Sequence, residues 1–432
     1  DLRIADAPGI AAATPDEPVC GIFLFDPTVL EYAASPRMRF LLDALISLRE
    51  SYRSRGSDLL IAHGDPSAVL PDLAADRGVT HVSWGDDYSG LSTERDRAVI
   101  DALEAADVSF AVHTDAVLHE PGEITTNAGD HYSVYTYFWK KWRDRAKTPP
   151  YPIPDREAFA AAEGEEMPSL SELGFDEPDG SIPEASTEAA RERLAAFLAE
   201  DVTTYEERRD DAAADATSRL SPHLTFGTIG IRELYSATVE AKEAADSSGA
   251  ENVEEFQSQL AWREFYLQVL ADQPSMTTEN ISSFAHDIEW RDAPAEFEAW
   301  CDGRTGVPIV DAGMRQLREE HWMHNRLRMI VASFLTKDLL IDWRRGYDWF
   351  RRRLVDHDAA NDAGGWQWAA STGTDAVPYF RVFNPWTQGE RFDENATYIK
   401  RYVSELGDVD PSAIHEWHEL DEESRDALAP DY

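Results

Sequence analysis

The segment Gly364–Asp375 carries the side chains in this chain that are best suited to chemistry. It places Trp366 and Trp368 two residues apart behind a glycine pair. Nine of the thirteen tryptophans lie between Trp262 and Trp386. Tryptophan is large, flat and needs a partner for its N–H, so this crowding is typical of a site for redox-active or stacked molecules. A large aromatic core explains the same pattern equally well.

A second group, Trp322–Met329, adds amide and guanidinium side chains. On a helix, Asn325, Arg328 and Met329 share one face at i, i+3 and i+4. An acidic run of Asp356, Asp358 and Asp362 follows before the glycine pair. Buried arginine and aspartate need each other, so Arg328 paired with Asp356 would present planar polar edges to a ring system.

Two other segments have the right residue types for ligand binding. Thr217–Ser221 resembles a hydroxyl-rich helix start, where backbone N–H groups and hydroxyls can hold a phosphate; simple N-capping is the alternative. Gln259 and Trp262 share a helical face at i, i+3 and offer a polar group beside a large ring. This arrangement suits a stacked base, and a core tryptophan with a neighbouring amide is equally compatible with it.

Histidines 321, 324 and 357 lie near these groups, but no Cys/His spacing typical of a metal site accompanies them. We therefore expect no metal.

The charge of the chain is strongly negative and unevenly distributed. The formal net charge is -42, and only six of the 40 basic residues are lysines. This composition is typical of a protein adapted to a salt-rich cytoplasm, where screening shortens the range of self-repulsion. Residues 301–402 hold 15 Lys+Arg and 14 Asp+Glu, a local net charge of +1. A polyanion would not be repelled by that region, although a solvated helix face explains some of its arginines.

Length and composition predict a two-domain protein without a membrane span. The 432 residues suit two domains, and two cysteines indicate a reducing compartment. No apolar run approaches the ~20 residues of a membrane helix, and no signal peptide is visible. We expect a cytoplasmic monomer.

The order of hydrophobic patterns predicts an α/β domain followed by an all-helical one. Residues 1–120 alternate strands and helices, which implies a doubly wound parallel sheet with right-handed crossovers. The expected strands are Val19–Phe25, Asp58–Ala62, His81–Trp84 and Ser109–His113, and the expected helices are Ser35–Arg55, Pro66–Arg77 and Thr93–Ala106. No G-x-G-x-x-G follows a strand. Residues 121–190 are expected to be a connector, and residues 191–432 a helical domain.

The motifs Trp322–Met329, Gly364–Asp375 and Tyr379–Pro385 resemble those of the DNA photolyase/cryptochrome family, most closely the class I cyclobutane-pyrimidine-dimer photolyases. The resemblance runs from Leu2 to about Trp417. It implies an α/β antenna domain, a connector, and a helical domain that binds FAD and the DNA lesion.

The resemblance also assigns cofactor and redox roles. The adenine side and pyrophosphate of FAD would be held by Tyr205, Thr217, Ser218, Arg219, Leu220 and Ser221. The isoalloxazine ring would be surrounded by Arg328, Asp356 and Asp358, with Asp362 facing its N5. The family's electron-transfer chain corresponds to Trp366, Trp343 and Trp290, in order from the flavin outwards.

The implied substrate is UV-damaged DNA that contains a cyclobutane pyrimidine dimer, flipped out of the duplex. Trp262 and Trp368 would form the walls of the lesion pocket, and its lining and neighbouring DNA contacts would include Gln259, Arg263, Asn325, Arg326, Met329 and Arg381. In high salt, phosphate contacts weaken, so we expect recognition to depend more on stacking. A flipped pair suits this pocket because damaged bases stack poorly.

The implied function is a light-driven lyase that reverses these dimers by electron transfer from excited, reduced FAD. Two departures from bacterial relatives bear on it: Gln259 replaces a glutamate and Asp362 an asparagine. Asp362 favours the alternative, a cryptochrome-type blue-light photoreceptor without repair. A third possibility is a single-strand nucleic-acid binder. An antenna chromophore, 8-hydroxy-5-deazaflavin or 5,10-methenyltetrahydrofolate, is compatible with the resemblance, as is an empty antenna site.

Overall fold

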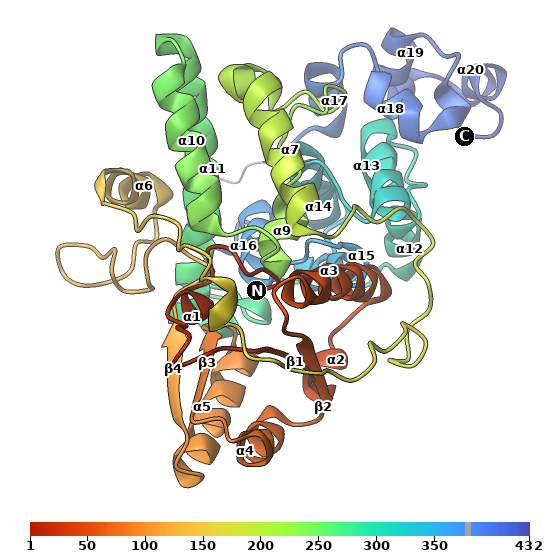
Figure 1. The fold of residues 1–432 in the computed structure, drawn as a ribbon. Coiled ribbons are helices and arrows are strands. Elements are labelled where there is room, and N and C mark those ends of the chain that lie inside the picture. The colour runs from red at the N-terminus through yellow and green to blue at the C-terminus, as the bar shows by residue number, and fades with distance from the viewer. Residues whose placement is uncertain (376–381) are drawn as a thin grey trace. The chain divides into compact units, whose positions relative to one another are not determined.

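The computed structural model describes residues 1–375 and 382–432. The chain divides into two compact units. The first comprises residues 1–177, 183–203 and 218–275, and the second residues 178–182, 204–217 and 276–432. Figure 1 gives the element labels. The boundaries expected near residues 120 and 190 stay a prediction.

The first unit contains two pairs of parallel strands. Strand β1 (Gly21–Phe25) pairs with β2 (Leu59–His63), and β3 (His81–Gly85) pairs with β4 (Ser109–His113). All four expected strands are therefore present, within two residues of their predicted bounds. The α/β prediction is confirmed, with one difference: within the described residues the strands form two separate hydrogen-bonded pairs rather than one continuous sheet.

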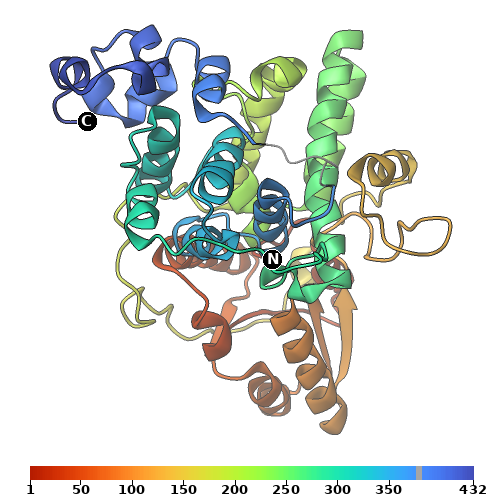
Figure 2. The ribbon, with the colours of Figure 1, turned by 180° about the vertical axis from the view of Figure 1, so that it is seen from behind.

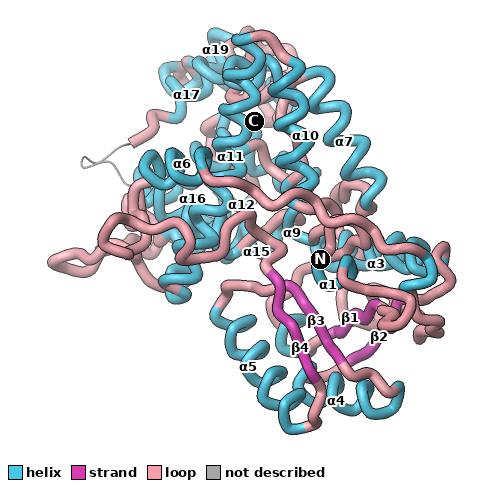
Figure 3. The backbone as a smooth tube through the Cα atoms, turned by 60° about the vertical axis from the view of Figure 1, so that its left-hand side comes forward, coloured by secondary structure: helices cyan, strands magenta, loops and turns pink. Residues whose placement is uncertain are grey.

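A shared hydrophobic cluster joins the two strand pairs. Leu70 of α4 (Pro66–Arg77) and Val99 and Leu103 of α5 (Gly90–Ala105) are buried against apolar side chains of three strands, which are Ile22, Leu24, Val82, Trp84 and Phe110. The strand residues lie two apart within β1 and within β3, so they point to the same face. Figure 3 shows α5 running along β4, the strand that it contacts. Burial of this face holds the α/β region together.

The three helices expected within residues 1–120 are present in the first unit, whereas the short helices Pro8–Ala11 and Pro27–Leu30 and the longer Tyr135–Asp144 were not predicted. Its helices are α1 (Pro8–Ala11), α2 (Pro27–Leu30), α3 (Ser35–Arg53), α4 (Pro66–Arg77), α5 (Gly90–Ala105), α6 (Tyr135–Asp144), α7 (Thr187–Glu200), α9 (Ser221–Phe226), α10 (Ile231–Ala244) and α11 (Ser247–Asp272). Helix α6 lies inside the expected connector. Its buried Tyr135, Phe138 and Trp142 follow helical spacing, a signal that the sequence analysis missed.

A buried ion network ties the start of the chain to α10. Arg232 donates to Asp6 at 2.7 Å and also contacts Asp115. Arg3 donates to the same Asp115. All four side chains are buried, so each charge depends on its partners, and removal of one would leave an uncompensated charge.

The second unit is helical, as expected. Its helices are α8 (Tyr205–Arg208), α12 (Pro294–Cys301), α13 (Pro308–Glu320), α14 (Asn325–Ser333), α15 (Trp343–Arg353), α16 (Ala359–Ala370), α17 (Pro385–Phe392), α18 (Thr397–Tyr402), α19 (Pro411–His415) and α20 (Glu422–Leu428), and a π-helical turn spans Phe334–Asp338. Helix α13 packs along α18, which Figure 2 shows from behind. Among the described helices, none is long and apolar enough to cross a membrane.

A buried carboxyl group fastens α11 to the segment after β4. Glu264 accepts hydrogen bonds from the backbone N–H of Leu118 at 2.8 Å and of His119 at 3.1 Å. Burial raises the pKa of Glu264 to about 7, although these donors oppose the shift. The folded protein therefore keeps this proton at pH values where the unfolded chain has lost it.

This raised pKa predicts a pH-dependent stability. Because the pKa of Glu264 is about 7 in the folded state and 4.5 otherwise, its contribution to the unfolding free energy falls as pH rises between these values. The expected loss is on the order of 3 kcal/mol. Glu264→Gln should flatten this dependence, measured by denaturant unfolding between about pH 5 and pH 8. Since His119 titrates in an overlapping range, the difference between wild type and variant is the relevant quantity, and a constant difference would contradict the prediction.

Candidate functional site

The start of α14 positions the amide and guanidinium side chains that the sequence singled out. His324 caps this helix, its Nδ1 accepting from the backbone N–H of Arg326 at 3.1 Å. Asn325 at the first helical position is exposed and its Nδ2 lies 3.9 Å from Sδ of Met329. Arg328 and Met329 are half-buried one turn later. The predicted shared face of Asn325 and Met329 is therefore present.

Arg328 is held by carboxylates on the neighbouring segment. Its Nη2 donates to Asp356 at 2.7 Å, and its Nε donates to the carbonyl of Met323 at 2.8 Å. Its Nη1 lies 3.7 Å from Asp362, too far for a hydrogen bond. Burial acts to lower the pKa of Arg328, but Asp356 and Asp362 outweigh it and the pKa lies above its ordinary value. The predicted Arg328–Asp356 pair is present.

Asp362 has a second partner that the sequence analysis did not predict. Nδ1 of His357 lies 2.6 Å from its Oδ2, and the ring of Tyr347 packs edge-on against the imidazole at 5.5 Å. Asp358 serves a different purpose: its carboxylate caps α16 by accepting from the backbone N–H of Asn361 at 2.8 Å. Asp362 therefore sits between Arg328 and His357, while Asp358 fixes the start of the helix that carries it.

Trp366 packs tightly on α15. Its indole is buried, and a Cβ added to Gly346 would lie 2.1 Å from its ring, so only glycine allows this approach. Its ring also meets Phe350 at 5.0 Å and Trp300 at 6.0 Å. Within the described residues, its Nε1 has no hydrogen-bond acceptor.

The other two tryptophans of the expected redox chain belong to the same unit. Trp343 begins α15, is fully buried, and donates from Nε1 to Asn280 at 2.9 Å. Trp290 lies on the loop before α12 and is half-buried. Trp290 is thus the most solvent-accessible of the three rings, and their role as an electron-transfer chain stays a prediction.

Trp368 and Gln367 are neighbours in the C-terminal turn of α16, but their surroundings differ. Trp368 is half-buried and meets Phe383 at 6.0 Å. Gln367 is fully buried and donates from Nε2 to the carbonyls of Met276 at 2.7 Å and Glu279 at 3.0 Å. These hydrogen bonds of Gln367 fix the position of α16, the helix that carries Trp368. The sequence analysis did not identify Gln367.

In the first unit, Trp262 is half-buried and one of its faces is covered. Tyr135 of α6 stacks on it with centroids 3.6 Å apart and planes 11° apart. A base could therefore stack on one side of Trp262 only. Gln259, on the same helix, donates to the carboxylate of Glu255 at 3.0 Å, and Arg263 donates to the carbonyl of Ala116 at 2.6 Å.

The hydroxyl-rich segment ends at a short helix, as expected, but capping does not explain it. Helix α9 begins at Ser221, and its N-cap position belongs to Leu220, whose side chain cannot accept a hydrogen bond. Arg219 has a positive φ of 49°. Ser218 to Ser221 belong to the first unit, and the buried Tyr205 and the half-buried Thr217 to the second. Arg381 lies outside the described residues.

The charged cluster of the second unit fits a flavin. Nη1 of Arg328 makes no hydrogen bond to Asp362 at 3.7 Å, and Nε1 of Trp366 finds no acceptor among the described residues. Both donors suit the carbonyl and nitrogen acceptors of an isoalloxazine edge. Hydrogen bonds to Asp356 and to the carbonyl of Met323 fix the guanidinium, so that its Nη1 edge is presented in one orientation.

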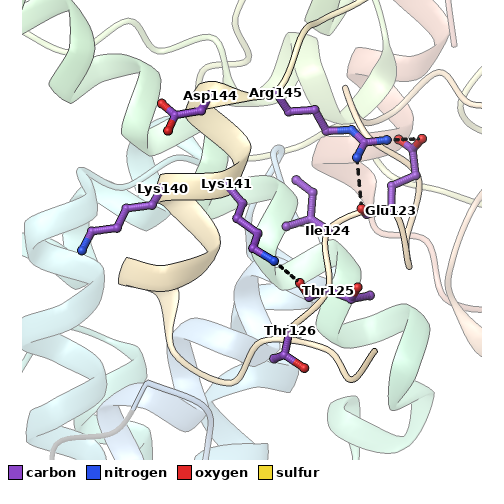
Figure 4. A pocket seen from close by; sticks show the side chains of 8 residues that line it. All are labelled: Glu123, Ile124, Thr125, Thr126, Lys140, Lys141, Asp144 and Arg145. Atoms are coloured by element: carbon purple, nitrogen blue, oxygen red, sulfur yellow. Dashed lines mark hydrogen bonds and ion pairs between the residues drawn. The ribbon is translucent and has the colours of Figure 1, made fainter. Parts of the chain in front are cut away.

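A basic cluster on α6 and just after its end was not predicted from the sequence. Three of the six lysines occur within eight residues, at positions 140, 141 and 147. A cavity of about 470 Å³ lies between α6 and the segment 123–126. In Figure 4, Lys141 reaches the carbonyl of Thr125 (2.7 Å), Arg145 pairs with Glu123 (2.8 Å), and Lys140 points away from that segment. Three lysines so close together in such an acidic chain are the sequence signal that could have identified this cluster.

The close approach of Trp366 to Gly346 predicts that this glycine is essential for packing. In Gly346→Ala, the new methyl would also lie 2.7 Å from Leu335, so α15 and α16 must separate. We expect a loss of roughly 1–3 kcal/mol in unfolding free energy, measured by denaturant unfolding. Gly365→Ala is the matched control because nothing lies within 4 Å of its added Cβ. Equal losses in the two variants would contradict the packing role.

Comparisons with known proteins agree with this geometry. Residues 1–155 match the family model described as DNA photolyase, and residues 256–432 the model described as the FAD binding domain of DNA photolyase. The chain is 58% identical to the deoxyribodipyrimidine photo-lyase of Halobacterium salinarum, over 100% of this chain and 93% of that relative. It is 42% identical to the deoxyribodipyrimidine photo-lyase of Synechococcus, over 96% of this chain and 88% of that relative.

Solved structures give the same result. A class III photolyase from Agrobacterium tumefaciens matches with a TM-score of 0.91 at 34% identity, covering 99% of this chain and 90% of that one. A photolyase from Sulfolobus tokodaii with two FAD molecules matches with a TM-score of 0.83 at 32% identity, covering 97% and 92%. The two family models, the full-length identity and these structures lead to one conclusion: the chain belongs to the DNA photolyase/cryptochrome family.

Proposed function

We infer that this protein is a light-dependent DNA repair enzyme, a deoxyribodipyrimidine photo-lyase that binds FAD and splits cyclobutane pyrimidine dimers. The observation that carries this conclusion is the 58% identity to a photo-lyase along the whole chain. The structure supplies a matching site, in which the half-buried Arg328 is fixed by Asp356 and its Nη1 makes no hydrogen bond to Asp362. When bound, the reduced flavin supplies, after absorbing light, the electron that splits the dimer and regains it afterwards.

We propose that the helical cluster orients the flavin. Arg328 donates to acceptors on the ring, and Asp356 keeps its guanidinium charged and in place. Asp362, which His357 contacts at 2.6 Å, holds or moves a proton at the flavin edge. The roles of Tyr205, Thr217 to Ser221 and Asp358 in FAD binding stay predictions, and Asp358 combines such a role with capping α16.

Three tryptophans are proposed to carry electrons to the flavin from outside. Trp366 and Trp343 are buried, and Trp290 is half-buried. A buried redox centre needs intermediate electron carriers to exchange electrons with a reductant in the solvent. The close packing of Trp366 against Gly346 holds the indole of this first carrier in a fixed position.

Lesion recognition is proposed to combine stacking with phosphate contacts. Trp368 and the uncovered face of Trp262 are half-buried, so each can still stack on a base, worth ~1–3 kcal/mol. Gln259, Arg263, Asn325, Arg326, Met329 and Arg381 remain the proposed neighbouring contacts. We add Lys140 and Lys141, because they are exposed and because Tyr135 joins their helix directly to Trp262.

The photoreceptor alternative rested on Asp362. Relatives at 58% and 42% identity are photo-lyases, so the repair function is favoured. An antenna chromophore is compatible with the family, and the Sulfolobus tokodaii photolyase contains a second FAD. The identity of any antenna here, a cytoplasmic location and a monomeric state stay predictions.

Direct assay of repair tests the function. The reduced, FAD-loaded protein is illuminated with an oligonucleotide that contains a thymine dimer, and recovery of thymine absorbance is followed. We expect recovery in light and none in darkness. Damaged DNA that is bound but unchanged after prolonged illumination would indicate the photoreceptor alternative.

Trp366→Phe should separate electron supply from repair. Phenylalanine keeps the packing on Gly346 but removes the readily oxidised indole, so photoreduction of oxidised protein should slow strongly. Repair by chemically reduced protein should stay unchanged. Trp300→Phe, at a buried ring that meets Trp366 at 6.0 Å, is the packing control. Loss of repair in the chemically reduced Trp366→Phe variant would show that this indole is needed for more than electron supply.

Replacement of Lys140 and Lys141 by glutamine should weaken binding to any DNA, damaged or not. Each lost phosphate contact lowers the slope of log affinity against log salt by ~1. Fluorescence anisotropy across a salt series measures this slope. Lys400→Gln, a lysine of α18, is the control for loss of charge alone. The α6 proposal fails if the slope of the double variant equals that of the control.

A further inference from the structure

Arg326, a proposed DNA contact, already holds an anionic partner. Its Nε donates to Oδ1 of Asp210 at 3.1 Å and its Nη2 to Oδ2 at 2.6 Å. Both residues belong to the second unit, although 116 positions separate them. The arrangement is bidentate: two parallel N–H groups face two oxygens of one carboxylate.

The contacts around the pair fix Asp210 in place. The guanidinium of Arg326 lies 4.4 Å from the ring centroid of Phe392, and the N–H of Ala212 donates to the carbonyl of Phe392 at 3.3 Å. Arg401 donates to the carbonyl of Ala213 at 3.3 Å. The turn that carries Asp210 is thus anchored to the same aromatic residue on which Arg326 lies.

Arg326 adjoins the proposed lesion face. It directly follows the exposed Asn325 and precedes Met329 by three positions on α14. The side chain of Asp210 is 34% exposed and that of Arg326 15% exposed. The pair therefore lies where solvent, and a DNA strand, can reach it.

A carboxylate and a phosphate form the same bidentate arrangement with an arginine side chain. Both present two oxygens that accept parallel N–H bonds, and both are anionic. Because Asp210 is partly exposed, water can solvate its carboxylate once the pair opens, and the incoming phosphate restores the two N–H bonds of Arg326, so the exchange replaces one anion by another without leaving a buried charge unpaired. Asp210 thus occupies Arg326 in the manner of a backbone phosphate.

We propose that Asp210 is an internal competitor of DNA phosphate for Arg326, and that binding of DNA exchanges the carboxylate for a phosphodiester group. The inference rests on the proposed DNA-repair function. It identifies a residue that sets the salt dependence of binding. Asp210 lowers the affinity of the protein for undamaged DNA, where phosphate contacts dominate, more than it lowers stacking on a lesion.

The exchange also reduces the dependence of binding on salt. A phosphate that pairs with a free arginine releases a counterion from DNA, which contributes ~0.9 to the salt slope. When the phosphate displaces Asp210, the freed carboxylate attracts a cation from solution. This uptake offsets the release, so the Arg326 contact persists at salt concentrations that weaken an ordinary one.

The experiment compares Asp210→Asn with wild type in binding to dimer-containing and undamaged oligonucleotides across a salt series. We expect affinity at low salt to rise about threefold to fivefold and the salt slope to steepen by ~1. Because phosphate contacts dominate on undamaged DNA, the ratio of damaged to undamaged affinity should fall. Thermal unfolding of each variant verifies that the fold is intact.

Two further variants isolate the pair. Arg326→Gln should weaken binding and flatten the slope, and Asp210→Asn added to it should have no further effect. Asp302→Asn is the matched control, since it removes a carboxylate of similar exposure whose partner, Arg304 at 2.6 Å, is not part of α14. It should leave the slope unchanged.

The possible outcomes separate this inference from the proposed function. Equal slopes for wild type and Asp210→Asn, or equal effects of Asp210→Asn and Asp302→Asn, would overturn the exchange while repair still proceeds. An additional effect of Asp210→Asn in the Arg326→Gln background would overturn it as well. Failure of illuminated wild type to repair DNA that it binds would contradict the proposed function and leave the exchange intact.

Discussion

The charged cluster around Arg328 is the interaction on which the helical site depends. The guanidinium of Arg328 has lost part of its hydration, and the neighbouring Asp356 and Asp362 compensate for that loss. The same pairing fixes α14 against α16, the helix that carries Trp366 and Trp368. We therefore propose that this one set of charges orients the flavin, the first redox tryptophan and one wall of the lesion pocket.

Arginine–carboxylate pairing also explains how so acidic a chain keeps a near-neutral region. Most arginines between residues 301 and 402 have intramolecular partners, among them Arg315 with Glu405, Arg344 with Asp342, and Arg351 and Arg352 with Asp348. Paired arginines do not form a strongly basic surface. We propose that DNA binding by such a surface relies on exchange of partners and on stacking, both of which tolerate salt better than free cationic contacts do.

Sequence reasoning predicted the parts of the molecule that follow local rules. The strands β1–β4 were predictable because apolar runs and turn residues alternate, and the Arg328–Asp356 pair because buried opposite charges need each other. The motifs around Trp322–Met329 and Gly364–Asp375 pointed to the family that the comparisons confirmed. Helix α6 was missed although Tyr135, Phe138 and Trp142 follow helical spacing, because an acidic, proline-containing connector surrounds it.

Contacts between residues far apart in the chain could not be predicted from sequence patterns. Tyr135 stacks on Trp262, and Asp210 pairs with Arg326, across more than one hundred positions and without any local pattern. His357 is close to Asp362 in sequence, but only the turn before α16 brings the imidazole to the carboxylate. Such contacts depend on tertiary packing, which periodicity does not encode.

The wavelength dependence of repair tests the central claim most directly. Protein reconstituted with FAD alone and chemically reduced is given dimer-containing DNA, and the rate of dimer splitting per absorbed photon is measured across the near-ultraviolet and blue. The account predicts an action spectrum that overlays the absorption of the bound reduced flavin, with no splitting in darkness. Splitting in the dark, or at wavelengths that this flavin does not absorb, would contradict it.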